Sequence, residues 1–385
     1  MKKLVIFVLL IISCEAFAPN LPVVKIYSNG IIKFNEYVNA LIKLEYLDNE
    51  SEHTANIKCR GGFSSKFSKH SYRLELDKKA EFCGLEKEDD WILNANYIDK
   101  TFMRHKISYD LFRQMGENNL APKSEFVKVF LNDEYKGLYV LMQFVGAKFC
   151  GINKKDETAF LFKDPPVFYT AETYFSLSPE NPKGQKFPKI KKRDISETLV
   201  NLQNFLFETE DEVFIENVGK VFDLDNVADW HILLLLTNNQ DGIMKNFYLY
   251  KQDAYTLIRF AIWDYDHSFG RDGDNELNML ERKIDCNRSI LIKRLMENPE
   301  IGYKDLLKRK WDKYRKSGVI SCVNLYRMIF DNHIRIQSEI KHNFNLWPIN
   351  SEDYFDDANY YQEIVLMQNY LKIRIPELDN YFEKL

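Results

Sequence analysis

The chain has 385 residues, which at roughly 100 to 200 residues per domain allows two or three folding units and excludes a minimal single-core scaffold. Apolar residues make up 45% and aromatic residues 14% of the chain, a composition that excludes intrinsic disorder and allows large hydrophobic cores. Lys and Arg total 53 against 57 Asp and Glu, so the net charge of −4 gives no overall positive field and argues against a nucleic-acid partner.

The first 18 residues have the features of a secretory signal. Lys2 and Lys3 give a positive start, an apolar run occupies 4–12, and small residues suited to cleavage follow at 13–18. The apolar run is too short to cross a bilayer and no later run is long enough, so we expect no transmembrane segment after signal removal. The expected location is secreted or extracellular. Residues 11–14 also resemble a bacterial lipobox, and in that alternative Cys14 would carry lipid and anchor the protein to a membrane surface.

Without Cys14 the chain keeps five cysteines and no CxxC spacing, so a zinc knuckle is not supported. In an oxidising compartment one or two disulfides are conceivable. The pairs nearest in sequence are Cys59 with Cys83 and Cys286 with Cys322. The pairing cannot be deduced from the sequence alone.

The segment 23–162 mostly shows the period-two alternation of apolar and polar residues that is typical of strands. The clearest runs are 42–46, 56–59, 72–76, 126–131 and 138–142. The last two flank the turn formers of 132–137 and predict a β-hairpin. One helix is predicted at 101–115, with Asp99 as its N-cap and Gly116 at its end.

The segment 164–195 is rich in proline and ends in a cluster of basic residues, so we predict a linker or mobile loop. Beyond it, apolar residues recur at helical spacing. The predicted helices are 196–207, 225–237, 291–297, 303–314, 319–343 and 353–382, the last broken or kinked near Pro376. A hairpin of strands 246–250 and 257–263 interrupts them. The predicted domains are thus a signal peptide at 1–18, a β-rich N-lobe at 19–163, the linker, and a helical C-lobe at 196–385, with a ligand cleft between the lobes.

The densest group of unexpected polar residues follows the predicted helix 225–237. Asp241 and Asn246 lie five positions apart, and Asp264 follows the next predicted strand. This order matches the Asp and Asn of a protein-kinase catalytic loop and the metal-binding Asp of the following hairpin, and such oxygen ligands suit Mg²⁺ or Mn²⁺. The alternative is a set of structural turns and strand-end caps, which these residue types often form. We expect a turn of the chain to carry Asp266 away from the metal.

A second feature is the sequence Arg60-Gly61-Gly62-Phe63-Ser64 between two predicted strands. Glycines let backbone N–H groups approach phosphate oxygens closely, and basic residues that follow at 66–73 add positive charge. The segment matches neither GxGxxG nor the P-loop pattern, so a plain turn is an equally good interpretation.

The order of these segments resembles the spore coat protein H (CotH) kinase-like family of secreted atypical kinases. The matching motifs run in the family's order along nearly all of the chain after the signal. They are 60–64, 69–74, 91–94 with Asp99 and Arg104, 132–141, 239–241 with 246–250, 263–266 with 269–270, and Arg374.

The resemblance implies an α+β, two-lobed atypical protein-kinase-like fold, with a β-rich N-terminal lobe and a mostly helical C-terminal lobe. It implies transfer of the γ-phosphate of ATP, with Mg²⁺ or Mn²⁺, to Ser or Thr of a secreted or surface protein. Asp241 would then be the catalytic-loop Asp, and Asn246 and Asp264 the metal ligands. The residues expected to bind ATP or its phosphates are Lys69, Arg60, Gly61, Gly62, Ser64 and Gln143.

Gln143 marks a departure from the family pattern. The family's strand usually runs Gly-x-Tyr-x-x-x-Glu, whereas here Gly137 and Tyr139 are followed by Gln143. A neutral amide cannot form the ion pair that a carboxylate makes with a lysine, so the positioning of ATP would be weakened. The alternative function is therefore a catalytically weak or inactive CotH-like surface protein that acts as an adhesin or binding module.

Overall fold

The structure is a computed structural model that describes residues 20–34, 36–168, 184–271, 282–350, 353 and 358–385. The predicted signal peptide, with the lipobox Cys14, lies outside these residues and stays a prediction. Among the helices that the structure describes, none is long and apolar enough to cross a membrane.

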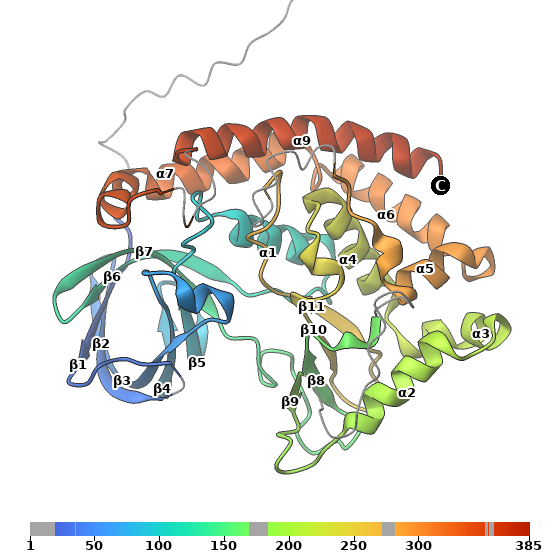
Figure 1. The fold of residues 1–385 in the computed structure, drawn as a ribbon, viewed down its shortest axis with the longest axis horizontal. Helices are drawn as coiled ribbons and strands as arrows, with labels where there is room; N and C mark the ends of the chain where they lie inside the picture. Colours follow the sequence, from blue (N-terminus) through green and yellow to red (C-terminus); the bar gives the residue numbers. More distant parts are fainter. Residues whose placement is uncertain (1–19, 35, 169–183, 272–281, 351–352, 354–357) are drawn as a thin grey trace, which may run out of the picture.

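Seven strands of the N-terminal part close into a barrel, drawn at the lower left of Figure 1. In chain order they are β1 (Val23–Ser28), β2 (Val38–Tyr46), β3 (Asn49–Arg60), β4 (Ser71–Phe82), β5 (Leu85–Asn94), β6 (Ser124–Leu131) and β7 (Glu134–Gln143). Neighbours pair antiparallel in the order β1-β2-β3-β4-β5-β7-β6, and a parallel pairing of β6 with β1 closes the ring. Alternate residues point inward and form a hydrophobic core within the barrel.

A second sheet of four strands lies in the middle of the molecule (Figure 1). It consists of β8 (Phe160–Lys163), β9 (Gln185–Phe187), β10 (Phe247–Lys251) and β11 (Arg259–Ile262), in the order β11-β10-β8-β9. The predicted hairpin corresponds to β10 and β11. The segment 164–195, predicted as a linker, contains strand β9. This strand was not predicted because three residues are too few to give a periodic signal in the sequence.

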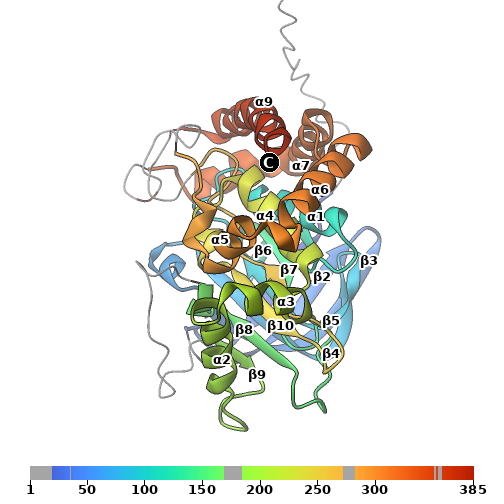
Figure 2. The same cartoon turned by 90° about the vertical axis from the view of Figure 1, so that its right-hand side faces the viewer.

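Helices cover the second sheet and reach across to the barrel (Figure 1). They are α1 (Arg104–Met115), α2 (Ser196–Phe207), α3 (Asp211–Val221), α4 (Leu224–Thr237), α5 (Ile290–Glu297), α6 (Tyr303–Ser317), α7 (Cys322–Leu346) and α9 (Tyr360–Glu383). The side view of Figure 2 separates α2 and α3 from α7 and α9, which run across the top. Helix α7 also contacts strand β7 of the barrel.

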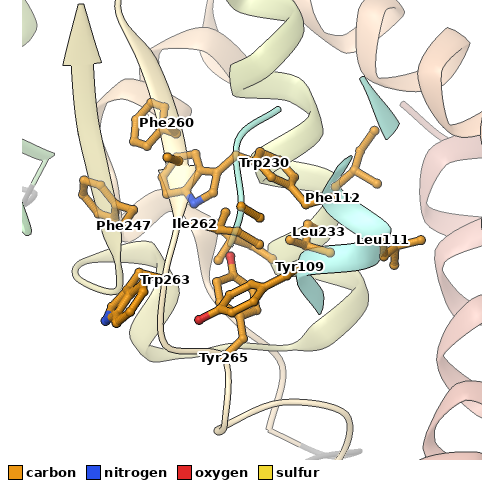
Figure 3. Close-up of a cluster of buried hydrophobic side chains, with 14 of the residues drawn as sticks. Tyr109, Leu111, Phe112, Trp230, Leu233, Phe247, Phe260, Ile262, Trp263 and Tyr265 are labelled. Carbon is orange, nitrogen blue, oxygen red and sulfur yellow. The ribbon is translucent and has the colours of Figure 1, made fainter. Parts of the chain in front are cut away.

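Helix α4 is apolar on almost all sides and is buried from Asn226 to Thr237, so it forms the centre of the larger core. Trp230 of α4 stacks on Phe260 of β11, with ring centroids 4.2 Å apart. Figure 3 shows this contact together with Tyr109 of α1. The packing fixes β11, and with it the segment that follows this strand, against α1 and α4.

Helix α1 begins at Arg104, three residues after its predicted start. Phe102 has φ +63°, a left-handed conformation that cannot belong to a right-handed helix. The N-cap position is Met103, so Asp99 is not the N-cap as predicted. Its carboxylate nevertheless accepts hydrogen bonds from the backbone N–H groups of Thr101 and of Arg104, the first residue of the helix. The predicted end before Gly116 is confirmed.

The C-terminal helix differs from its prediction at both places where a prediction was made. Helix α9 begins at Tyr360, behind a capping box formed by Asn359 and Gln362, rather than at residue 353. It then continues through Pro376 without the predicted break.

The five cysteines that the structure describes are free, so the disulfides considered from sequence are not formed. Cys59 and Cys83 are both buried in the barrel core, where the Cys59 thiol donates to the carbonyl of Ile32. Burial raises the pKa of the Cys59 thiol to about 11, so the group stays protonated and unreactive at neutral pH.

The predicted α+β class is confirmed by the presence of sheets and helices in one chain. The closed barrel does not by itself establish the two-lobed kinase layout, which stays a prediction together with the domain boundaries.

Candidate active site

A cleft of about 450 Å³ lies where barrel residues face the turns around β10 and β11. We call it the aspartate cleft. It is lined by 60–64, Phe67, Lys69, Ser71, 94–98, His105, Met142, Lys163, Asp241, Lys245, Asn246, Trp263, Asp264, Asp266 and His267. Segments that are more than 200 positions apart in sequence therefore meet in one place.

The predicted site residues meet in this cleft with one exception. Those that line it are Asp241, Lys69, Arg60, Gly61, Gly62, Ser64, Asn246 and Asp264. Gln143 is absent from the described lining. Its buried Oε1 accepts a hydrogen bond from the backbone N–H of Lys123, at 2.9 Å, whereas the preceding Met142 faces the cleft. Successive residues of a strand point to opposite sides, so this geometry does not support the expected contact of Gln143 with ATP.

Asp264 and Asp266 form a close pair of carboxylates in the cleft. Oxygens of both lie within 4.8 Å of each other and of a ring nitrogen of His105. Asp264 has φ +59°, so the chain does turn there, but the turn returns Asp266 to the same side. The expectation that Asp266 points away from the metal is therefore wrong. Burial, together with the charge of Asp266, raises the pKa of Asp264, which is the situation that a divalent cation relieves.

The hydrogen bonds of His105 decide whether it is a ligand. Its Nδ1 accepts a hydrogen bond from the backbone N–H of Tyr265, at 2.8 Å, so Nδ1 carries no proton. The neutral ring then has its proton on Nε2, the nitrogen that faces Asp264 at 3.7 Å. A protonated nitrogen cannot bind a metal, so the ligand set here consists of oxygens, as Mg²⁺ and Mn²⁺ prefer.

Asn246 presents its amide oxygen to the cleft for a structural reason. Its Nδ2 donates to the backbone carbonyl of Asp264, at 2.9 Å, which fixes the amide orientation and leaves Oδ1 as the end available to a cation. The residue has φ +65°, a conformation that Asn tolerates better than most residues.

Asp164 is a residue that sequence reasoning missed. It directly follows β8, and its Oδ1 accepts hydrogen bonds from the backbone N–H groups of Asn246, at 2.7 Å, and Phe247, at 3.3 Å. Burial raises its pKa, with Asp264 contributing to the shift. The only sequence signal was one Asp before Pro165, in a segment interpreted as a linker. Asp164 holds the turn that presents Asn246.

Asp241 lies in a short 3₁₀ turn, Asp241–Ile243, at the cleft surface. Its Oδ2 is 2.9 Å from Lys245 Nζ and 3.9 Å from His267 Nδ1. The carboxylate side chain keeps about a third of its surface exposed, at 35%, so an incoming hydroxyl group can reach it. Asp241 thus combines accessibility with a neighbouring cation.

Lys69 lines the cleft but its ammonium group is already used. Nζ donates to the carbonyls of Ala95, at 3.0 Å, and Leu138, at 2.5 Å, and to Oδ1 of Asn343 on α7, at 3.1 Å. Three acceptors match the three N–H groups of the ammonium. The predicted phosphate contact is therefore not supported by this geometry; Lys69 instead connects the barrel to α7.

Replacing Lys69 with Met should lower the free energy of unfolding by about 2–3 kcal/mol, because it leaves buried oxygens without donors. Nucleotide affinity should change little. Urea unfolding and nucleotide titration of Lys69→Met and of the exposed control Lys341→Met, on α7, would check both points. Unchanged stability with a tenfold loss of nucleotide affinity would instead restore Lys69 as a phosphate contact.

A larger cleft of about 1040 Å³ adjoins the first and shares Arg60 and Lys163 with it. We call it the basic cleft. Its basic lining residues are Arg60, Arg73, Lys148, Lys154, Lys155, Lys163, Lys186, Lys189, Lys192 and Arg193. Apolar side chains from the connection after β7, including Phe144 and Ala147, form another part of the wall. The same lining contains the acidic residues Glu75, Glu88, Asp89, Asp90, Asp156 and Glu157, of which the first four pair with Arg73 or Lys148. Basic residues therefore outnumber acidic ones by ten to six on this side of the aspartate cleft.

Arg60 occupies the junction of the two clefts. Its guanidinium lies 5.5 Å from the ring centroid of Trp263 and is close enough to Asp264 to interact electrostatically with it. Burial lowers the pKa of Arg60, against the opposing effect of Asp264, yet an arginine stays charged at neutral pH. The predicted phosphate-binding residue therefore lies at the junction, between the basic cleft and the carboxylates.

Comparison with known proteins identifies the family. The family model described as CotH kinase protein matches residues 57–377. The chain belongs to the CotH kinase family. Membership supports a kinase-like phosphotransferase function. The matched region includes every residue discussed for the aspartate cleft.

The individual relatives and solved structures share 28% or less of their sequence with this chain. Inner spore coat protein H of Bacillus subtilis (strain 168) is 28% identical over 272 residues, which cover 68% of this chain and 72% of that protein. Among solved structures, the Golgi casein kinase aligns over 95% of this chain and 74% of its own, at 12% identity and a TM-score of 0.33. The Helicobacter pylori proinflammatory kinase CtkA aligns over 83% of this chain and 100% of its own, at 10% identity and a TM-score of 0.26.

Proposed function

We propose that this CotH kinase family member transfers the γ-phosphate of ATP to the hydroxyl group of Ser or Thr in a protein, with Mg²⁺ or Mn²⁺ at Asp264, Asp266 and Asn246. The observation that carries the proposal is the meeting of Asp241, Asn246 and the Asp264–Asp266 pair in one cleft, beside Arg60 and Lys163. The two-lobed kinase layout belongs to the same proposal, with the barrel as the N-terminal lobe.

The donor set fits a hard divalent cation. Asp264 and Asp266 supply carboxylate oxygens and Asn246 supplies an amide oxygen, while His105 is excluded by its hydrogen bond to Tyr265. When bound there, Mg²⁺ or Mn²⁺ would neutralise charge on the phosphates and on the leaving group.

The triphosphate would extend from the basic cleft towards the carboxylates. Arg60 and Lys163 line both clefts and are the cations at the crossing point. Phe144 and Ala147 provide an apolar wall for the base in the basic cleft. In this arrangement the γ-phosphate would lie near Asp241.

Asp241 would orient the acceptor hydroxyl and take its proton. The hydroxyl oxygen forms a bond to the γ-phosphorus while the bond from that phosphorus to the β,γ-bridging oxygen breaks, and the proton passes to the Asp241 carboxylate. Lys245, at 2.9 Å from Asp241, adds positive charge where the transferred phosphate would lie. The hydrogen bond and the charge of Asp241 raise the pKa of Lys245 despite its partial burial, so this side chain stays a cation.

An acceptor polypeptide has an apolar surface available at the cleft mouth. Phe63 is 66% exposed there, and it contacts Phe67, whose ring packs against Tyr97 with centroids 5.1 Å apart. We propose that the acceptor is a secreted or surface protein, in keeping with the spore coat location in the name of the B. subtilis relative and with the predicted signal at 1–18.

The inactive alternative was motivated by Gln143. Since Gln143 binds the backbone of Lys123 and lies outside both described clefts, its lack of charge does not weaken the proposed site. The predicted secretory signal, the other ground for an adhesive role, is compatible with either function.

The proposal is tested by titrating ATP, with Mg²⁺, with Mn²⁺ and without a cation, against the purified protein and following thermal unfolding. A ligand that binds only the folded state raises the unfolding temperature, so we expect a cation-dependent rise with ATP. The absence of a shift with every cation and nucleotide would refute the kinase proposal. A shift without transfer to any acceptor would favour the inactive alternative.

Arg60→Met should weaken ATP binding by about tenfold or more, because it removes charged hydrogen bonds to phosphate while keeping much of the side-chain volume. The exposed Arg309→Met on α6 serves as the matched control. Calorimetric titration with ATP in the presence of Mg²⁺ measures the effect. Equal affinities of Arg60→Met and the control would remove Arg60 from the phosphate site.

A further inference from the structure

Two side chains of α1 hold the backbone of the turn that carries the metal ligands. Tyr109 Oη accepts a hydrogen bond from the backbone N–H of Asp264, at 3.0 Å, and His105 Nδ1 accepts one from the next N–H, that of Tyr265, at 2.8 Å. His105 and Tyr109 are one helical turn apart and their rings stack, with centroids 5.8 Å apart. One face of α1 thus binds two consecutive N–H groups.

This turn requires support from outside itself. Asp264 is a non-glycine residue at φ +59°, which the surrounding structure has to stabilise. Its carboxylate also lies close to that of Asp266. The carbonyl of Asp264 is held by Asn246, so α1 and the turn before β10 bind the two sides of the same residue.

The contact is between elements distant in sequence. Figure 3 shows Tyr109 of α1 directed towards the segment that carries Trp263 and Tyr265. Both partners from α1 are buried: Tyr109 is 0% and His105 is 2% exposed. A hydrogen bond buried in this way cannot be replaced by water when one partner is removed, so loss of an acceptor lets the turn relax.

We propose that His105 and Tyr109 are positioning residues that hold the Asp264–Tyr265 backbone so that the Asp264 and Asp266 carboxylates converge on one cation, and that α1 thereby sets the cation affinity. The inference rests on the proposed function, since it concerns the same cation site. The two acceptor atoms, Nδ1 of His105 and Oη of Tyr109, bind backbone N–H groups. Their effect passes through the backbone of Asp264.

The structure provides a matched control for Tyr109→Phe. Tyr303 of α6 is buried in the same core, outside both described clefts, and its hydroxyl group lies 3.3 Å from Nδ1 of His231, so Tyr303→Phe removes the same atom from the same core away from the cation site. For His105, Asn keeps an acceptor near the position of Nδ1 and loses Nε2, whereas Leu removes both. The pair His105→Asn and His105→Leu therefore separates backbone support from any role of Nε2.

The experiment measures Mn²⁺ binding to the purified protein without nucleotide, by electron paramagnetic resonance of free Mn²⁺, together with thermal unfolding in a chelator. We expect Tyr109→Phe to weaken Mn²⁺ binding about tenfold and Tyr303→Phe to leave it unchanged. His105→Leu should weaken binding similarly, and His105→Asn should recover most of it. In an Asp264→Asn background, Tyr109→Phe should add no further loss, because both changes act through the same ligand.

Each outcome distinguishes the proposals. Wild-type protein that binds no Mn²⁺ would overturn the proposed function and this inference together. Normal Mn²⁺ binding by Tyr109→Phe and His105→Leu would overturn only the role of α1. A loss in His105→Asn equal to that in His105→Leu would overturn the backbone role and indicate action through Nε2. If Tyr109→Phe fails to fold, the His105 pair decides the question.

Discussion

Replacing Asp264 with Asn is expected to abolish phosphate transfer and to weaken cation-dependent ATP binding by at least about 100-fold, since loss of even an indirect metal contact costs 10- to 100-fold. The carboxylate is paired with Asp266 around a shared position, and removing one negative charge removes the main attraction for a divalent cation. Calorimetric titration with ATP, with and without Mg²⁺, measures the loss.

The control for this prediction is Asp225→Asn, a change of the same kind at a side chain that is 74% exposed on α4. It should leave both quantities unchanged. Asp266→Asn should resemble Asp264→Asn in direction, because the two carboxylates lie in one group. Retention of cation-dependent binding by Asp264→Asn would show that the cation lies elsewhere.

Asp241→Asn is expected to reduce phosphate transfer by about 10²–10⁴-fold and to leave the affinity for Mg·ATP within about threefold of the wild type. An amide keeps the shape of the side chain and can still accept a hydrogen bond from Lys245, but it cannot take the hydroxyl proton. Radioactive labelling of casein, or of the protein itself, measures transfer, and calorimetry measures affinity.

Measuring both phosphate transfer and Mg·ATP affinity of Asp241→Asn separates a loss of catalysis from a loss of binding. Transfer lost with binding intact identifies Asp241 as the residue that acts on the acceptor hydroxyl. Transfer at the wild-type rate in Asp241→Asn would exclude this role and leave the residue as a surface partner of Lys245. Loss of both transfer and binding would place Asp241 among the cation ligands instead.

Much of the fold was visible in the sequence because it depends on local periodicity. The helix α2 was predicted with its observed bounds, and strands of the barrel follow the alternation at 42–46 and 72–76. The helix α3 was not predicted: only Phe214 and Val218 of it are buried, so its apolar stripe is weak. Closure of the barrel could not be predicted either, because it depends on a parallel pairing between β1 and β6, which are about 100 residues apart.

Site residues could be chosen from the sequence where their spacing matches a known motif. The roles of other residues depend on tertiary contacts that the sequence does not show. Asp241, Asn246 and Asp264, which were chosen from their order in the sequence, do meet in one cleft. Lys69 and Gln143 could not be interpreted correctly from sequence, because the acceptors of Lys69 include Asn343, and the side to which Gln143 points depends on the register of β7. The return of Asp266 depends on one dihedral angle, the positive φ of Asp264, which no sequence pattern shows for a non-glycine residue.

The edge strands of the two sheets determine whether another chain can pair with them. The barrel has no free edge strand, since β6 returns to β1. In the second sheet, β9 is three residues long, and isolated bridges from Leu120 and Phe222 occupy positions beside β11. Exposed strand edges are the usual template for unintended pairing between chains, and the described sheets offer little unpaired backbone of this kind. Recognition of other molecules by these sheets would therefore depend on side chains rather than on strand pairing.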